Sequence, residues 1–195
     1  MFEFKVGSIT AAFDFSFFAA VTLTALLGGG YAAIGLGACI WHELGHLAVM
    51  TVLSIPVKKV FFYGAGIKIV TDRQLEYAPF KTGFAVLIAG SAANFAAASL
   101  FYQSGNANFK LFAAVNLVIG VFNLLPLRNL DGGKIMILLI RSVCSYSRAC
   151  LLERYFKWVN VILIMTVLIV FAFLGKGNLT LYATLCYLLV SSMTC

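Results

Sequence analysis

Residues 40–49 read IWHELGHLAV, a hydrophobic stretch that holds a glutamate and the only two histidines of the chain. Burial of such polar groups among apolar neighbours is costly unless something compensates for it. On an α-helix, His42 and His46 are separated by about 400° of rotation and a rise of about 6 Å, so both imidazoles lie on one face. The spacing therefore predicts a helix that offers two nitrogen ligands to a single zinc ion.

Two further residues of this stretch suit hydrolytic chemistry. Glu43 follows His42 directly and lies beside the expected metal without being forced to bind it. From there it can accept a proton from a zinc-bound water, whose pKa the metal lowers to about 7. Gly45 has no side chain, so a substrate or another helix can approach closely. The alternative is a pair of histidines that only form hydrogen bonds between packed helices.

The composition indicates that this helix lies in a membrane. Of the 195 residues, 62% are hydrophobic and 11% are charged, and the mean hydropathy is +0.99, whereas soluble domains are about 45–50% apolar. The sequence predicts an all-α polytopic membrane protein, a single transmembrane domain over 1–195, with a small membrane-associated β-hairpin. Regions 54–81 and 128–156 interrupt the helical pattern. Six spans of adequate length are expected, at roughly 12–28, 31–53, 82–101, 111–127, 157–174 and 179–194.

The distribution of basic residues predicts the orientation. Lys5 and the regions 54–81 and 128–156 contain 12 of the 14 lysines and arginines, counting Lys157 with the second region, and the opposite loops hold only Lys110 and Lys176. This is the positive-inside pattern, which places the N-terminus and both regions in the cytoplasm of a multi-pass cell-membrane protein. It also explains the net charge of +7 without a nucleic-acid partner.

A third zinc ligand is needed, because a catalytic zinc takes about three protein ligands and one water. The five cysteines are odd in number and are interpreted as small apolar residues rather than as a disulfide framework. Cys39 lies on the histidine stripe but about 10 Å along the axis from His46, so one regular helix cannot supply all three ligands. Asp131 is the best candidate from elsewhere in the chain.

The context of Asp131 supports a ligand role. Residues 122–134 read FNLLPLRNLDGGK, and Pro126 disturbs the helix that leads into them. Freed backbone groups at membrane depth are tolerated only where protein or a water-filled cavity satisfies them, so the stretch should line a polar pocket. The alternative is that Asp131 caps a helix over 132–141. Capping alone does not need the two following glycines or the upstream asparagine, which favours the ligand interpretation.

His-Glu-Leu-Gly-His in a membrane span, followed by Asn-Leu-Leu-Pro and Leu-Asp-Gly-Gly, resembles the site-2 protease family of intramembrane zinc metalloproteases. The stretch PVKKVFFYGAGIKIV and the later FKTGFAVLIAGSAANF are also similar to that family. The resemblance covers residues 31 to about 140, the motif-bearing core, and is strongest to the subgroup of the stage IV sporulation protein FB.

The resemblance implies roles for six residues. One zinc per chain is bound, water is activated by a glutamate, and an asparagine holds the substrate or its oxyanion. A second asparagine is expected to bind substrate as well. The residues are His42, His46 and Asp131 as ligands, Glu43 as base, and Asn123 and Asn94 for substrate.

The implied reaction is regulated proteolysis of a membrane-embedded or membrane-tethered protein, such as a pro-sigma or anti-sigma factor, in a bacterial inner membrane. Regulation is expected from substrate processing or a membrane partner. Two departures affect loop geometry and substrate class. The chain has Gly90-Ser91 where the family usually has Gly-Pro, and Arg128-Asn129 where a second proline is common.

The segment 56–71 has two possible roles. Residues 56–71 are rich in β-branched and aromatic residues around glycines, which predicts a hairpin. Its exposed edge could hold an unwound substrate by backbone hydrogen bonds, or the hairpin could only join two spans.

The rival to a protease is a membrane zinc-binding or transport protein, which would use the same ligands but would not need Glu43 as a base.

Overall fold

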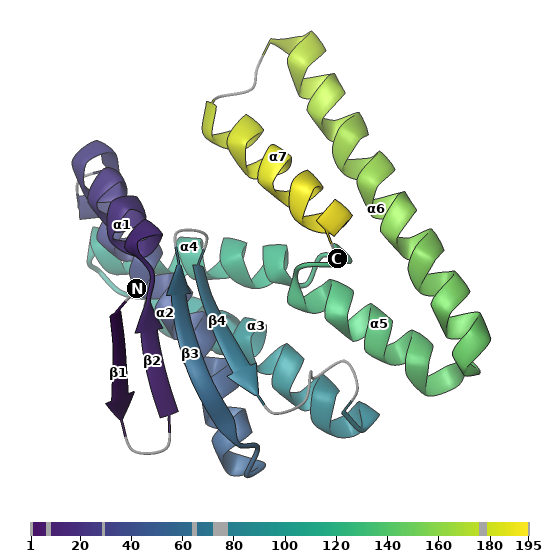
Figure 1. Ribbon diagram of the computed structural model, residues 1–195. Helices are drawn as coiled ribbons and strands as arrows, with labels where there is room; N and C mark the ends of the chain where they lie inside the picture. The colour runs from purple at the N-terminus through teal and green to yellow at the C-terminus, as the bar shows by residue number, and fades with distance from the viewer. Residues whose placement is uncertain are drawn as a thin grey trace. The chain divides into compact units, whose positions relative to one another are not determined.

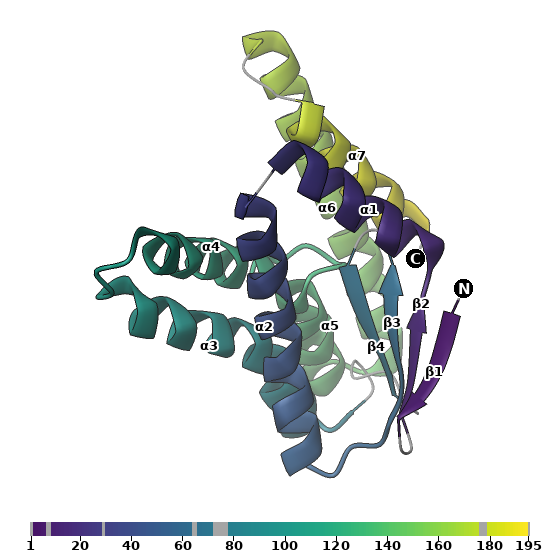
Figure 2. The same cartoon turned by 90° about the vertical axis from the view of Figure 1, so that its left-hand side faces the viewer.

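The structure is a computed structural model that describes residues 2–6, 9–28, 30–63, 66–71, 78–175 and 179–194. The chain forms two compact units, Met1–Leu124 and Leu125–Cys195. Figures 1 and 2 show helices in both units and a small sheet in the first.

The sheet of the first unit has four strands in the order β1-β2-β3-β4. Strands β3 and β4 pair antiparallel and form the expected hairpin, although its turn residues 64–65 lie outside the described part. β2 pairs parallel with β3 and antiparallel with β1. The bounds are β1 (Phe2–Val6), β2 (Ile9–Phe13), β3 (Val57–Tyr63) and β4 (Gly66–Thr71).

The expectation of an isolated hairpin, with the first span starting near residue 12, was wrong. Residues 9–13 form β2 instead, and Phe13 stacks on Phe62 of β3 with ring centroids 4.4 Å apart. Helix α1 (Phe15–Gly28) starts only after Asp14, whose backbone N–H donates to the Phe62 carbonyl over 2.8 Å. The Ser16 hydroxyl donates to the Asp14 carboxylate, which lowers the pKa of that carboxyl.

Three helices of the first unit pack against one another: α2 (Gly30–Val52), α3 (Phe80–Tyr102) and α4 (Ala107–Asn123). Figure 2 shows α2 between the sheet and the α3–α4 pair. Small residues bring α2 and α3 together, because a Cβ on Gly45 would lie 2.6 Å from the Ala89 carbonyl oxygen and 2.7 Å from the Ala93 Cβ. Close helix approach at small residues is typical of membrane helices.

The second unit consists of α5 (Asp131–Val143), α6 (Tyr146–Leu174) and α7 (Leu179–Thr194). Figure 1 shows α7 running back along α6. The prediction that 128–156 interrupts the helices was therefore largely wrong, since α5 and the first turns of α6 fill it. Arg141 of α5 and Glu153 of α6 form an ion pair, with Nε and Oε1 2.6 Å apart, so charged residues there support helix packing.

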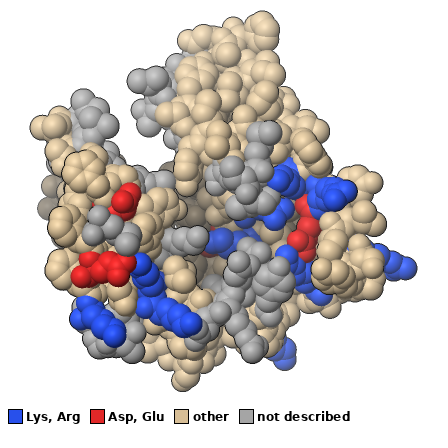
Figure 3. All heavy atoms as spheres, in the orientation of Figure 1, with Lys and Arg blue, Asp and Glu red and all other residues tan. Residues whose placement is uncertain are grey.

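Among the described residues, three helices are long and apolar enough to cross a membrane: α2 from Tyr31, α3 and α6. Helix α4 is apolar but shorter, so the six expected spans are not confirmed. Figure 3 shows lysine and arginine side chains gathered near the sheet in the first unit and around a limited part of the second. Much of the remaining visible surface is uncharged, as expected for helices that face lipid.

Candidate metal centre

The two histidines lie on α2 as the sequence predicts, one turn apart and buried, with 5% and 7% of their surfaces exposed. Their Nε2 atoms are 3.1 Å apart and their rings are nearly perpendicular, at 85°. Two nitrogens that bind one tetrahedral zinc at about 2.0–2.1 Å are about 3.3–3.4 Å apart. His42 and His46 are thus spaced as a zinc-binding pair.

A backbone carbonyl of α3 sets the tautomer of His46. The Nδ1 atom of His46 lies 2.7 Å from the carbonyl oxygen of Val86. A carbonyl oxygen only accepts hydrogen bonds, so Nδ1 carries the proton and Nε2 keeps its lone pair. Metal-binding histidines almost always donate their other ring N–H in this way, which fixes ring orientation and raises basicity. His46 therefore presents Nε2 toward His42 as a ligand atom.

Gly90 of α3 forms the wall against which both imidazoles pack. A Cβ at this position would overlap His46 Nε2 and would lie 2.6 Å from His42 Cε1 and 2.7 Å from His42 Nε2. Only glycine leaves the ring nitrogens in place. The sequence reasoning missed this role, although a glycine inside an apolar helix costs about 1 kcal/mol relative to alanine and so calls for a reason.

Glu43 lies on α2 directly after His42 and is only partly buried, unlike the two histidines. This position suits a general base beside a buried nitrogen pair.

Helices α3 and α4 bury further polar groups. Ser91 and Asn94 of α3 and Asn116 of α4 are completely buried. Among the described residues, no hydrogen-bond partner is found for the Ser91 hydroxyl, either amide atom of Asn94, or the Asn116 carbonyl oxygen. Buried polar atoms normally have partners, so these atoms call for water or a ligand. Asn94 lies one helical turn from Gly90, which keeps it a candidate for substrate binding.

Asn123 is the last residue of α4, three positions before Pro126, so the predicted helix break is confirmed. Its side chain is partly buried, and its Nδ2 donates to the Ile119 carbonyl over 3.0 Å.

Asp131 belongs to the second unit and is buried, with 6% of its surface exposed. It is the first residue of α5, whose N-cap is Leu130 without a side-chain cap. The alternative that Asp131 is the N-cap is therefore wrong. Its Oδ1 lies 3.5 Å from the Lys134 ammonium, a partly exposed pair that contributes little to stability.

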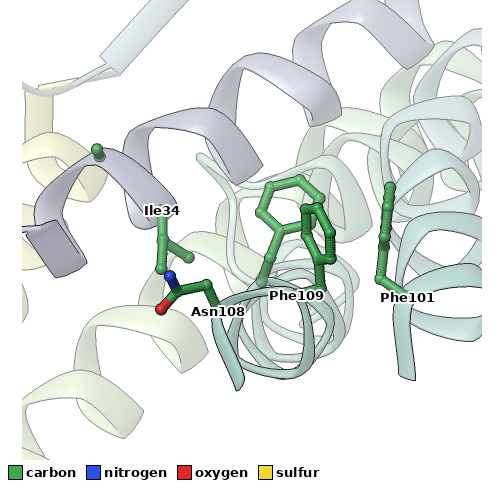
Figure 4. A pocket seen from close by; sticks show the side chains of 6 residues that line it. Ile34, Phe101, Asn108 and Phe109 are labelled. Carbon is green, nitrogen blue, oxygen red and sulfur yellow. The ribbon is translucent and has the colours of Figure 1, made fainter. Parts of the chain in front are cut away.

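A hollow of about 330 Å³ in the first unit is separate from the histidines. Figure 4 shows Ile34, Phe101, Asn108 and Phe109 around it. Ile34 precedes His42 by eight residues, which is about 12 Å along the helix. The lining is almost entirely apolar, so this hollow offers no ligands for a metal.

Comparison with known proteins gives a consistent result. The model of Peptidase family M50 matches residues 103–170, which include Asn123 and Asp131. Stage IV sporulation protein FB of Bacillus subtilis (strain 168) is 35% identical over 117 residues, covering 55% of this chain. The chain is thus similar to proteins of the site-2 protease family. It spans only 39% of the length of the sporulation protein.

The fold is shared with a protein of known structure. The Site-2 Protease from Methanocaldococcus jannaschii superimposes with a TM-score of 0.70, covering 99% of this chain and 94% of that one. The identity is 19%, so this likeness concerns the fold alone.

Proposed function

We propose that this protein is an intramembrane zinc metalloendopeptidase that cleaves a membrane-embedded or membrane-tethered protein. The observation that carries the proposal is the pair of buried Nε2 atoms 3.1 Å apart, with Glu43 next in the chain. Similarity to the site-2 protease family supports the same conclusion.

The residues fit a zinc ion. His42, His46 and Asp131 are each buried, and each offers a side-chain atom of the right chemistry to hold a metal. Gly90 leaves space beside the two nitrogens that a methyl group would fill. We assign these three side chains as the ligands of one zinc per chain, which leaves a fourth position for water. When bound, zinc lowers the pKa of that water and polarises the scissile carbonyl.

The protein side chains then carry out the proton transfers. Glu43 accepts a proton from the attacking water as its oxygen adds to the carbonyl carbon of the peptide bond. As the C–N bond breaks, Glu43 returns the proton to the leaving amine nitrogen. Asn123 and Asn94 hold the substrate backbone, since an amide side chain can both donate to and accept from a peptide group.

A substrate helix must unwind locally before hydrolysis, because its peptide groups are shielded by helical hydrogen bonds. β4 is an edge strand of the sheet, and an extended segment can add to such an edge through backbone hydrogen bonds. We propose β4 as the docking edge. The substrate class is a membrane-tethered protein, for which a pro-sigma or anti-sigma factor is the expected example, and a membrane partner is the expected regulator.

Replacement of Glu43 by glutamine tests the function. The variant keeps size and hydrogen bonding but loses the basic oxygen, so zinc content should be unchanged. Cleavage of a co-expressed membrane substrate should fall by about 10²–10⁴-fold, the usual contribution of a general base. A zinc transporter would instead show altered zinc flux on loss of a histidine and little effect of Glu43→Gln. Cleavage by this variant at near wild-type rate contradicts the proposal.

A further inference from the structure

Asn160 is a buried polar residue within the longest apolar helix, α6, with 3% of its surface exposed. Both ends of its amide are used. Nδ2 donates to the Phe156 carbonyl of its own helix over 2.9 Å. Oδ1 accepts the backbone N–H of Arg128 over 3.1 Å. The second bond leaves the helix and reaches the loop that leads into Asp131.

That loop is tightly folded. The backbone N–H of Leu127 donates to the Leu125 carbonyl over 2.7 Å, and that of Leu130 donates to the Leu127 carbonyl over 2.9 Å. These bonds leave the intervening Arg128 N–H pointing to Asn160 rather than to another backbone group. A buried N–H that lost its acceptor would cost about 1–3 kcal/mol.

The other side of the loop rests on α5. A Cβ on Gly133 would overlap the carbonyl group of Leu127 and would lie 2.7 Å from the Arg128 Cα. The loop is therefore held between Gly133, two residues after Asp131, and the amide of Asn160. Both contacts act on the same short segment, Leu127 and Arg128, which lies three to four residues before Asp131.

We propose that Asn160 is a positioning residue of the metal centre. Its amide fixes the 127–130 loop on the start of α5. The loop in turn holds the Asp131 side chain in one orientation. The inference rests on the proposed function, in which Asp131 is a zinc ligand. Groups that orient a metal ligand typically change metal affinity by about 10–100-fold when they are removed.

The test compares zinc affinity in purified full-length variants by chelator competition. Asn160→Leu keeps the volume and removes both hydrogen bonds. Asn160→Gln keeps the amide but moves it outward by one methylene, and Asn160→Asp keeps an acceptor for the Arg128 N–H. Thr166→Val is the matched control, since it removes a side-chain bond of α6 to the Ile162 carbonyl without touching the loop.

We expect Asn160→Leu and Asn160→Gln to weaken zinc binding by about 10–100-fold. Asn160→Asp and Thr166→Val should stay within about threefold of wild type, because the acceptor and the loop are kept. Wild-type affinity in Asn160→Gln overturns the inference, and so does equal weakening in Asn160→Gln and Asn160→Asp. These two variants decide the matter if Asn160→Leu does not fold.

Asp131→Ala separates this inference from the proposed function. If Asp131→Ala loses zinc while Asn160→Gln keeps it, the positioning role is wrong and the ligand assignment stands. If Asp131→Ala binds zinc like wild type, the ligand assignment is wrong.

Discussion

Gly90 of α3 packs against both imidazoles, where a Cβ would overlap ring atoms. The arrangement of the two histidines therefore depends on the absence of a side chain at this position. His46 is oriented by a carbonyl of the same helix, from Val86. Helix α3 thus supplies both the steric wall and the hydrogen-bond acceptor for the histidines of the neighbouring helix α2.

The first residue-scale prediction concerns Gly90→Ala. Its methyl group would overlap ring atoms of both histidines, so zinc affinity should fall by about 10–100-fold, the usual effect of disturbing the orientation of metal ligands. Overpacking should also cost about 1–3 kcal/mol of stability. Gly37→Ala on α2 is the control, because its Cβ would meet only Phe112 at 3.6 Å. Zinc titration of both variants checks the prediction, and equal affinities would contradict it.

The second residue-scale prediction concerns the ligand set. His42→Ala, His46→Ala and Asp131→Ala should each lose bound zinc and proteolysis, because two ligands hold zinc much more weakly than three. Thr166→Val serves as a control, since the exposed Thr166 hydroxyl donates to the Ile162 carbonyl within α6 and is not assigned to the metal. Metal analysis of the purified proteins gives the answer. Full zinc occupancy in all three ligand variants would refute the assignment.

The elements differ in how well the sequence predicted them. Helix α2 was found correctly because its evidence is local, in the spacing of two histidines within one apolar run. Strand β2 was missed because residues 10–13 pair with residues 59–62, far along the chain, and their apolar side chains also suit a span. The start of α6 was missed because Arg148, Glu153 and Arg154 look like a polar loop, whereas Glu153 pairs with Arg141 of α5. A hydropathy profile does not reveal contacts between residues that are far apart in the sequence.

One prediction belongs to the edge strand β4. A single cysteine at Val70 of β4 should form disulfides with cysteines at alternate positions of a substrate trapped by Glu43→Gln, because side chains along an added strand alternate between two faces. The native cysteines are first replaced by alanine. A cysteine at Phe4 of β1, on the opposite edge of the sheet, is the control. Cross-links from Phe4 alone, or none from Val70, would show that the hairpin only joins two helices.

At the scale of the whole molecule, three helices among the described residues can span a bilayer and coexist with charged segments that cannot. Lys58 and Lys59 lie on the sheet, and Arg148 is near the start of α6. Lys110 is near the start of α4. The positive-inside pattern therefore still predicts that Lys58, Lys59 and Arg148 lie on one side of the membrane and Lys110 on the other. An orientation with the N-terminus in the cytoplasm would place the sheet there as well.

The last prediction tests this orientation in intact cells. Single cysteines at Lys58, Arg148 and Lys110, all exposed, are introduced into a variant without native cysteines. A membrane-impermeant maleimide should label the Lys110 position directly, and the Lys58 and Arg148 positions only after permeabilisation. The physical reason is that lysine and arginine near span ends are retained on the cytoplasmic side during insertion. Arg73, another basic residue of the same region, lies outside the described residues, so Lys58 represents that region. Labelling of Lys58→Cys or Arg148→Cys in intact cells would contradict this orientation and would show that the labelled position lies outside the cytoplasm.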